Sequence, residues 1–291
     1  MNHDTSSQKP SSQTSKSAML PRYAERLAAF HRAFEPELRA VVAALPLRPD
    51  MRVLDVGCGD GFYMSLLAER LGPKGCLTGL DINPAFIDVA RQNVLLGAAS
   101  CRTEFVIGKL SDLPALREQF DVVWCAQSLY SLPEPVSSLQ QIASALRPRG
   151  LLAILENDTL HQLLLPWPSQ LEISLRVAEY TALTQKSRRP EKFYIGRRLP
   201  ATLAAAGLEP LGFQTQSIDR GFPLDRNLRQ FLQLYLADLS ERVHDHLDEE
   251  TARELGELIN PEAENYLLDD PFFTMSWLNV LAWGRTGRSG I

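Results

Sequence analysis

The sequence predicts an α/β protein, with a seven-stranded, mostly parallel sheet covered by helices on both faces and with helical lid insertions. Two observations favour this fold class. Short apolar runs of strand length alternate with helical segments between residues 52 and 156, which is the pattern of β–α–β units. Three glycines at alternate positions follow the first of these runs, and glycine tolerates the tight turns that a ligand-binding loop needs. We expect the carboxyl ends of the strands to share one edge, where ligands bind.

The N-terminal part divides into a polar tail and a helical cap. Residues 1–20 are mostly polar, rich in Ser and Thr, and lack the apolar stretch of a secretory signal, so we expect a disordered tail. Residues 21–48 are expected to form a helical cap. Their apolar residues recur at spacings of three and four, at Tyr23, Leu27, Phe30, Phe34, Leu38, Val41 and Leu45. Pro36 is expected either to divide this helix into two or to kink it.

Strands and helices alternate through the first part of the core. The expected strands are 52–56, 76–81, 104–107, 120–126 and 151–156. The expected helices between them are 64–71, 85–96 and a third that ends at Leu146. This order predicts right-handed crossovers between parallel neighbours.

The pattern loosens after Glu156. Residues 158–194, rich in Leu, Pro and Trp, are expected to be an irregular connection. The elements that follow are a helix ending at Gly207, a strand, a second helical region and a last strand, over 197–206, 209–218, 223–268 and 274–283. We therefore expect a core of residues 49–221 and 270–291. A helical lid insertion, residues 222–269, separates its last two strands.

Composition excludes several classes of protein. The net charge of −5 disfavours a nucleic-acid partner, because binding to phosphates needs a basic surface. No run of 18 apolar residues occurs, so no membrane span is expected. The four cysteines, Cys58, Cys76, Cys101 and Cys125, form no C-x-x-C pair. We expect buried, reduced thiols of a cytoplasmic protein and no metal site.

The glycine loop, "LDVGCGDGFY" at residues 54–63, narrows the class of ligand. The dinucleotide-binding pattern is G-x-G-x-x-G, but here the third glycine comes one residue early, at Gly61, and Phe62 follows it. The loop also lacks the Gly-Lys-Ser/Thr of phosphate-binding loops. An NAD(P)-dependent oxidoreductase of the same general fold is therefore an alternative that the loop disfavours.

Four ordered motifs resemble those of the class I S-adenosylmethionine-dependent methyltransferases. They are "VLDVGCGDG", "LTGLDIN", "FDVVWCAQSLYSLPEP" and "ALRPRGLLAILE", within residues 50–157. The resemblance is greatest to the small-molecule enzymes grouped around the ubiquinone and menaquinone methyltransferases. It implies a Rossmann-like fold, S-adenosylmethionine as cofactor, and in-line methyl transfer to a small molecule that leaves S-adenosylhomocysteine. A catalytically silent cofactor-binding scaffold is a second alternative.

The resemblance also implies a cofactor site. Asp55 would take the ammonium of the cofactor's amino-acid end, Asp81 would accept from both ribose hydroxyls, and Ile82 and Leu110 would enclose the adenine. Lys109 stands where the family commonly has an acidic residue, and a lysine cannot accept from the adenine amino group. Simple capping of a turn or helix is the alternative for Asp55 and Asp81. The full expected set is Tyr23, Asp55, Gly57, Cys58, Gly59, Asp81, Ile82, Lys109, Leu110, Gln127, Ser128 and Tyr130.

The sequence says less about the residues that bind the methyl acceptor than about those that bind the cofactor. His161 follows the fifth strand and is the candidate general base, and Asp158 has the same placement; an exposed or structural role is the alternative for both. Four aromatic residues suggest an aromatic-walled pocket for an apolar or cationic substrate: Trp167, Tyr180, Phe193 and Tyr194. The basic cluster within residues 186–198 suggests an acidic group on the acceptor, with a solvated surface as the alternative. The acceptor atom is not determined by these patterns.

Overall fold

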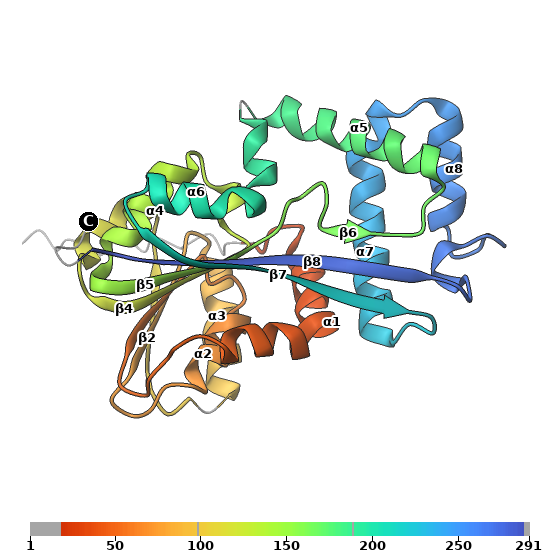
Figure 1. The fold of residues 1–291 in the computed structure, drawn as a ribbon. Coiled ribbons are helices and arrows are strands. Elements are labelled where there is room, and N and C mark those ends of the chain that lie inside the picture. Colours follow the sequence, from red (N-terminus) through yellow and green to blue (C-terminus); the bar gives the residue numbers. More distant parts are fainter. Residues whose placement is uncertain (1–18, 98, 188, 288–291) are drawn as a thin grey trace, which may run out of the picture.

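A single sheet of eight strands forms the central layer, in the order β3-β2-β1-β4-β5-β8-β6 with β7 paired to β8 (Figure 1). The computed structural model describes residues 19–97, 99–187 and 189–287, so residues 1–18 of the expected tail lie outside the described residues. The strands are β1 (Arg52–Val56), β2 (Cys76–Asp81), β3 (Arg102–Ile107), β4 (Phe120–Ala126), β5 (Leu146–Glu156), β6 (Leu163–Leu164), β7 (Glu209–Gly221) and β8 (Thr274–Arg285). The first five strands are parallel, and β8 is antiparallel to β5, β6 and β7. The expected fold class is confirmed, and the two-residue β6 is an additional strand.

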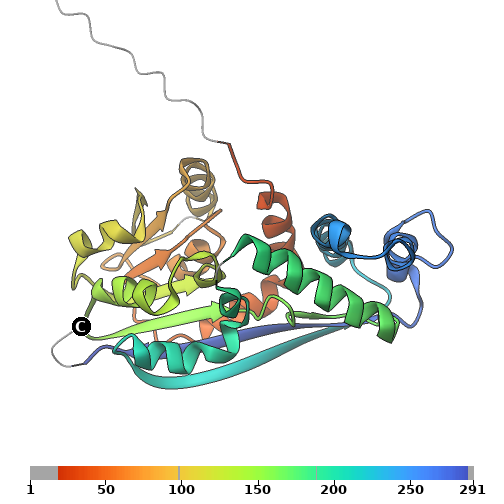
Figure 2. The same cartoon turned by 90° about the horizontal axis from the view of Figure 1, so that it is seen from above.

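Helices cover both faces of the sheet. α1, α2 and α3 lie below it in Figure 1, and α4, α5 and α6 lie above it; Figure 2 shows the second group from above. The α-helices are α1 (Ala24–Ala43), α2 (Phe62–Ala68), α3 (Pro84–Leu96), α4 (Pro135–Ser144), α5 (Ser169–Lys186), α6 (Leu199–Ala205), α7 (Arg226–Val243) and α8 (Glu249–Ile259). The 3₁₀ helices are η1 (Leu110–Leu116), η2 (Leu129–Ser131), η3 (Pro190–Tyr194), η4 (Gly196–Arg198), η5 (His244–His246) and η6 (Leu267–Asp269).

The core is divided by the sheet, as the apolar strands require. Val53 and Leu54 are neighbours in β1, and both are fully buried, but they belong to different apolar clusters. Successive side chains of a strand point to opposite faces. A strand that is apolar at every position therefore needs a helical layer on each side, which fixes the three-layer architecture.

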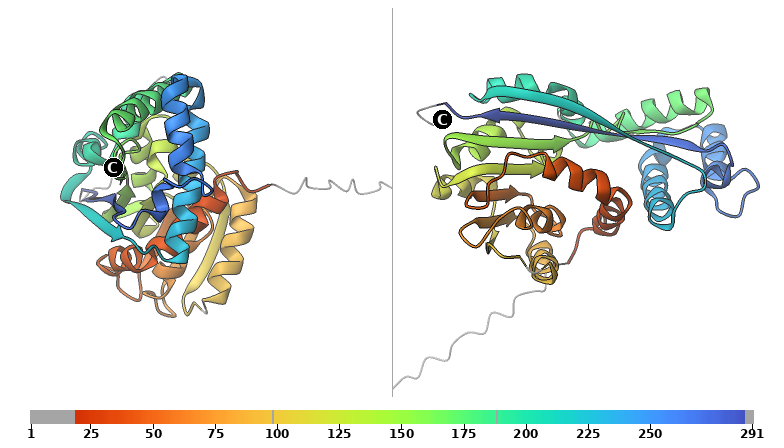
Figure 3. Two further views of the ribbon diagram at one scale, coloured as in Figure 1. Left: turned by 90° about the vertical axis from the view of Figure 1, so that its right-hand side faces the viewer. Right: turned by 60° about the horizontal axis from the view of Figure 1, so that its bottom comes forward.

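The N-terminal helix α1 is continuous but bent. Pro36 lies inside it, where proline removes one backbone hydrogen bond and crowds the preceding turn. Figure 1 and Figure 3 show the two halves of α1 running in different directions. Of the two expected outcomes at Pro36, the kink is the one observed. The first half of α1 is thereby directed toward the carboxyl ends of the strands.

The expectation of an irregular connection over residues 158–194 is wrong. This segment contains the 18-residue helix α5. Its buried apolar positions are Leu171, Leu175, Ala178 and Ala182, and Glu179 is buried beside them. The four apolar positions do follow helical spacing, but two of them are alanines and give little apolar contrast. None of the helices in the described ranges has both the length and the apolar content needed to span a membrane.

The last two strands form a ribbon that extends beyond the rest of the sheet (Figure 3). β5 pairs only with residues 280–285 of β8, whereas β7 pairs with β8 as far as Thr274. The segment between β7 and β8 carries α7 and α8, and α7 packs against α1 and α5. The first helix of the described chain and the helices near its end therefore meet beside the extended ribbon.

Candidate active site

Three glycines shape the loop after β1. Gly57, Gly59 and Gly61 have φ angles of +73°, +52° and +80°, which other residues rarely adopt. A Cβ atom on Gly57 would lie 2.4 Å from Oγ of Ser128, in the turn after β4. A Cβ atom on Gly61 would lie 2.7 Å from Cα of Ala90, in α3. Gly57 thus permits a close approach at the ligand-binding edge, and Gly61 permits close packing of α2 on α3.

Asp81 ends β2 and is tied to the glycine loop. Its Oδ2 accepts from the backbone N–H of Gly59 at 3.0 Å, and its Oδ1 accepts from the backbone N–H of Asn83 at 2.8 Å. The N-cap of α3 is Asn83, whose side chain accepts from the backbone N–H of Ala85. Asp81 is therefore not the cap of that helix. Each of its oxygens keeps a lone pair for a further donor.

Asp55, in β1, is a buried carboxylate with an unused acceptor. It is 1% exposed, and its Oδ2 has no hydrogen-bond partner among the described residues. Burial, together with the charges of Asp81 and Asp60, raises the pKa of Asp55 well above its ordinary value. An uncompensated buried carboxylate is unfavourable, so this position suits a ligand that brings a positive charge.

A cavity of about 890 Å³ opens at the carboxyl ends of the central strands. Its floor comes from the glycine loop, the end of β2 and the turn after β4, and its walls include residues of α1, α5, α7 and β8. The cofactor residues expected from the sequence line this cavity, with the exception of Asp55. The structure thus brings together residues that lie up to 107 positions apart, from Tyr23 to Tyr130.

The side of the cavity near β3 is apolar and open. Ile82, Lys109 and Leu110 line it, and Ile82 is 63% exposed. Asp112 accepts from the backbone N–H of Lys109 at 2.8 Å, so its carboxylate caps the turn into η1 and is not part of the lining. This side offers aliphatic contacts for a flat ring.

The turn after β4 is held by the end of β5. Gln127 has a φ of +48°, a conformation that a non-glycine residue adopts at a cost, and its Nε2 donates to Oδ1 of Asn157 at 3.3 Å. Oε1 of Glu156 accepts from the backbone N–H groups of Leu129 and Tyr130 at 2.8 and 3.3 Å. These bonds fix the orientation of the turn toward the cavity.

α1 packs directly over the glycine loop. Nδ1 of His31 lies 3.2 Å from Oδ2 of Asp60, and the His31 ring stacks on Phe62 at a centroid distance of 4.2 Å. Asp60 also accepts from the backbone N–H of Phe62. Burial alone would raise the pKa of Asp60. The hydrogen bond with His31 and the charge of His31 outweigh burial, together with backbone hydrogen bonds, and the pKa of Asp60 lies below its ordinary value.

An aromatic chamber adjoins the glycine loop. The Phe30 ring lies 5.6 Å from Phe231 and 5.1 Å from Trp277, and all three line the cavity. Two guanidinium groups line it as well: Arg26 pairs with Asp238 at 2.6 Å, and Arg242 pairs with the buried Glu179. Burial and the charge of Glu156 raise the pKa of Tyr130, and the charges of Arg26 and Arg242 oppose that rise. This part of the cavity offers flat apolar contacts and the remaining N–H donors of two paired guanidinium groups.

Five cavity residues are not predicted from the sequence, because the elements that carry them are far apart along the chain. Arg26, Glu156, Phe231, Arg242 and Trp277 come from four separate elements that converge only in the fold. Phe231 belongs to an apolar helical stripe that indicates packing. Glu156 has one signal in the sequence, since it is a carboxylate directly after the apolar residues 151–155 of β5.

The structure does not bring the two expected catalytic residues to the cavity. Their chain neighbours Asn157, Thr159 and Gln162 line it, whereas His161 is exposed and Asp158 forms an ion pair with Arg197. Burial and the charges of Arg176 and Arg197 lower the pKa of His161. Their catalytic role stays a prediction, and this arrangement gives it no support.

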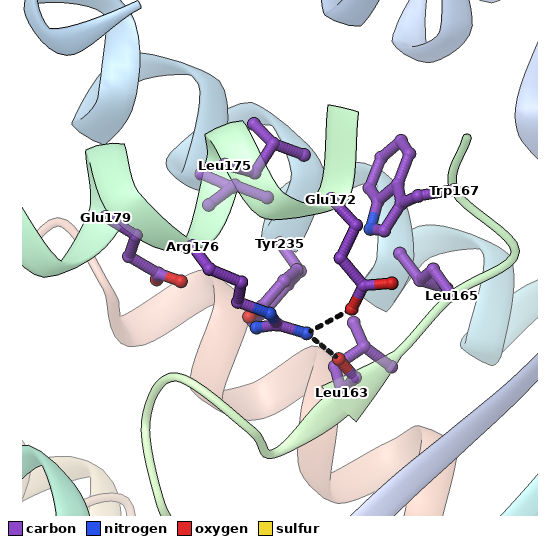
Figure 4. Close-up of a pocket in the computed structure, with 9 residues that line it drawn as sticks. Leu163, Leu165, Trp167, Glu172, Leu175, Arg176, Glu179 and Tyr235 are labelled. Carbon is purple, nitrogen blue, oxygen red and sulfur yellow. Dashed lines mark hydrogen bonds and ion pairs between the residues drawn. The ribbon is translucent and has the colours of Figure 1, made fainter. Parts of the chain in front are cut away.

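A second, much smaller cavity lies between α5, β6 and α7 (Figure 4). Its volume is about 10 Å³, room for about one water molecule. Arg176 closes it by donating to the carbonyl of Leu163 at 3.0 Å and to Glu172 at 3.2 Å. Trp167 lines this small cavity. Of the four aromatic residues expected around a substrate, Phe193 lines the large cavity.

The large cavity fits S-adenosylmethionine. Asp55 adjoins the glycine loop without lining the cavity, and its unpartnered Oδ2 matches an ammonium group. Gly57 and Gly59 line the cavity with no side chain to crowd a ligand. Asp81 offers two carboxylate oxygens at the next strand end. When bound, this group supplies an electrophilic methyl carbon on a sulfonium.

Comparison with known proteins agrees with this site. A methyltransferase domain model matches residues 47–195. A ubiquinone biosynthesis O-methyltransferase of Xanthomonas campestris is 33% identical over 175 residues, covering 60% of this chain and 67% of that protein.

Two solved structures are similar in fold. A methyltransferase structure from Bacillus halodurans has a TM-score of 0.54 at 17% identity, covering 86% of this chain and 98% of that one. A methyltransferase from Thiobacillus denitrificans in complex with S-adenosylhomocysteine has a TM-score of 0.50 at 19% identity, covering 90% and 98%. These findings give no support to the oxidoreductase or silent-scaffold alternatives. The chain belongs to the methyltransferase domain family and is an S-adenosylmethionine-dependent methyltransferase of the small-molecule type.

Proposed function

We propose that this enzyme methylates a hydroxyl group of an aromatic acceptor that carries an acidic group. The observation that carries the proposal is one continuous cavity that is lined by the glycine loop and Asp81 and also by an adjoining aromatic chamber with two arginines. The name of the relative from Xanthomonas campestris, an O-methyltransferase, supports oxygen as the acceptor atom.

In this proposal the cofactor spans the floor of the cavity. Asp55 compensates its ammonium group, Asp81 accepts from its ribose hydroxyls, and Ile82 and Leu110 contact its adenine. Backbone groups of Gly57 and Gly59 approach its amino-acid end, since neither residue has a side chain. The other residues of the expected set that line the floor are Tyr23, Cys58, Lys109, Gln127, Ser128 and Tyr130.

The acceptor would occupy the aromatic chamber. Phe30, Phe231 and Trp277 offer ring faces to an aromatic body. Each guanidinium has five N–H donors, so Arg26 and Arg242 retain donors for an acidic group beyond their carboxylate partners. The fold then contributes positioning, because in-line transfer needs the acceptor oxygen close to the methyl carbon and water excluded.

The basic cluster after α5 is a weaker candidate for the acidic group. Arg189, Lys192 and Arg197 do not line the large cavity, whereas Arg26 and Arg242 do. Arg188 lies outside the described residues. We therefore assign the acidic group to Arg26 and Arg242.

The helical lid is part of this proposal. α7 supplies Phe231 and Arg242, so the insertion of residues 222–269 would cover the acceptor. The cytoplasmic location expected from the sequence stays a prediction.

The test is methyl transfer from S-adenosylmethionine to a matched panel of 3,4-dihydroxybenzoate, 4-hydroxybenzoate and 4-hydroxybenzyl alcohol. We expect kcat/KM to be at least about tenfold higher for the acids, and Arg242→Met to remove that preference, because a charged hydrogen bond contributes about 1.5–3 kcal/mol. Arg253→Met, in an exposed pair on α8, is the control. Equal use of the neutral alcohol would refute the acidic group, and transfer to none of the three would refute the aromatic class.

A further inference from the structure

Glu156 is a buried carboxylate that none of the functions above requires. It ends β5, is 1% exposed, and lines the large cavity. Its hydrogen bonds come from backbone N–H groups: Leu129 at 2.8 Å and Tyr130 at 3.3 Å donate to Oε1, and Asn157 at 3.4 Å donates to Oε2. Amides are neutral donors, so they solvate the carboxylate without cancelling its charge. A buried carboxylate in this setting calls for a compensating cation.

Glu156 holds a turn that lies between the glycine loop and the aromatic chamber. The turn that it holds contains Ser128, whose Oγ lies against the glycine loop, and Tyr130, which feels the charges of Arg26 and Arg242 at the aromatic chamber. The reacting methyl group must lie between cofactor and acceptor, because the transfer is in line. In the cofactor placement proposed above, Glu156 would therefore lie beside the sulfur.

The charged and titratable groups around Glu156 provide little positive charge. Cys125 of β4 and Tyr63 of α2 are buried groups that supply no positive charge. Burial raises the pKa of each, and the charges of Asp55 and Glu156 raise it further. Arg26 of α1 and Arg242 of α7 are already paired with Asp238 and Glu179. Burial raises the pKa of Glu156 to about 8, and the backbone hydrogen bonds lower it only in part.

We propose that Glu156 is the counter-charge of the sulfonium, so that this enzyme binds S-adenosylmethionine in preference to S-adenosylhomocysteine. The two molecules share the amino-acid end, ribose and adenine, and they differ in formal charge only at sulfur. Asp55 and Asp81 would thus serve both equally, whereas Glu156 would act on the methylated form alone. After transfer the sulfur is neutral, and the product loses this interaction and leaves more readily.

This proposal rests on the cofactor placement given above. It predicts that the affinity for S-adenosylmethionine depends on pH. Binding of the cation favours ionised Glu156, so in the range where free Glu156 is protonated the protein releases a proton to solvent on binding. The affinity for S-adenosylmethionine, relative to the product, then rises by up to about tenfold per pH unit and levels off above the pKa of Glu156.

The experiment is calorimetric titration of the enzyme with S-adenosylmethionine and S-adenosylhomocysteine at pH 6.5, 7.5 and 9. We expect Glu156→Gln to weaken S-adenosylmethionine at least about tenfold at pH 9 and to leave S-adenosylhomocysteine nearly unchanged. The ratio of the two affinities, measured for Glu156→Gln at each pH, shows how much of the pH dependence comes from ionisation of the ligands themselves. Glu104→Gln, in an exposed pair with Arg102 at the start of β3, is the matched control.

A measurement on the unaltered enzyme guards against misfolding of the variant. Titrations at pH 7 in buffers of different ionisation enthalpy report the protons released, and we expect more release with S-adenosylmethionine than with the product. Equal weakening of both ligands by Glu156→Gln, or equal proton release, would overturn the selectivity and leave Glu156 a residue that only positions the turn. Failure of both ligands to bind the unaltered enzyme would overturn the cofactor placement as well.

Discussion

Asp81 is a single side chain that connects the glycine loop with the proposed ribose site. Its two oxygens hold the backbone N–H groups of Gly59 and Asn83. We expect Asp81→Ala to weaken cofactor binding at least about tenfold, because charged hydrogen bonds of about 1.5–3 kcal/mol each are lost. Calorimetry measures this, with the exposed Asp88→Ala of α3 as control. Unchanged affinity would remove Asp81 from the ribose site.

Glu156 also makes a prediction about stability. Its pKa is raised from 4.5 to about 8 in the folded protein, so the folded state binds this proton more tightly than the unfolded chain. The stabilisation from the proton is complete below about pH 4.5 and is lost as pH rises through about 8. We expect the Tm of the wild type, relative to that of Glu156→Gln, to fall between pH 5 and pH 9. A difference in Tm that stays constant with pH would show that Glu156 is not protonated in the folded state.

His161 is a residue whose substitution we expect to have no effect on activity. Its ring is exposed, lies 5.8 Å from the Tyr194 ring, and is outside the cavity lining. We therefore expect His161→Ala to leave both turnover and cofactor affinity close to the wild-type values. Steady-state kinetics and calorimetry measure the two quantities. A loss of turnover with unchanged affinity would restore the role of general base that the sequence suggests.

At the scale of elements, Gly61 decides how closely α2 approaches α3. A Cβ atom would lie 2.7 Å from Cα and 2.9 Å from Cβ of Ala90, and the φ of +80° is itself unfavourable for alanine. We expect Gly61→Ala to lower the free energy of unfolding by about 2 kcal/mol or more. Denaturant unfolding measures the change.

The matched control is Gly256→Ala in α8. Nothing lies within 4 Å of the position of its Cβ, and its φ is ordinary, so alanine should raise the free energy of unfolding by about 0.5–1 kcal/mol. Equal effects of the two substitutions would contradict a special role of Gly61 in helix packing.

The elements differ in how far their sequences determine them. β2 and β4 were predicted with the same limits that the structure shows, since a short apolar run between polar turns leaves little freedom. α5 was missed because it packs partly through alanines. The beginning of β5 was placed five residues late, at Leu151, since the "RPRG" that precedes it reads as a turn although Leu146 already pairs with Phe120.

At the scale of the whole molecule, an aromatic cluster joins the first helix to the last strand. Trp277 of β8 lies 5.1 Å from Phe30 and 5.7 Å from Phe34 in α1, and 5.5 Å from Phe231 in α7. We expect Trp277→Ala to lower the free energy of unfolding by about 3–5 kcal/mol. Phe272→Ala, at a ring that is 86% exposed, should change it by less than about 0.5 kcal/mol. Similar small effects for both would show that the cluster contributes little to holding α1.

Some residues of the candidate site belong to continuous sequence motifs, and others come together only through the fold. Asp55, the glycines and Asp81 belong to continuous motifs, so they could be predicted. Arg26, Arg242 and Trp277 carry no local signature, and their proximity depends on the kink in α1 and on the length of the β7–β8 ribbon. The methyl donor was thus predictable from the sequence, while the acceptor chamber needed the fold.

The central place of β8 has a consequence for biosynthesis. The ribosome makes residues 24–156, with the glycine loop and the five parallel strands, long before β8, which pairs with β5, β6 and β7. Until that strand emerges, the nascent chain exposes the unpaired edge of β5, and α1 lacks Trp277 as a packing partner. Exposed strand edges promote aggregation. We therefore expect the growing chain to depend on rapid elongation, or on a chaperone, between the synthesis of β5 and that of β8.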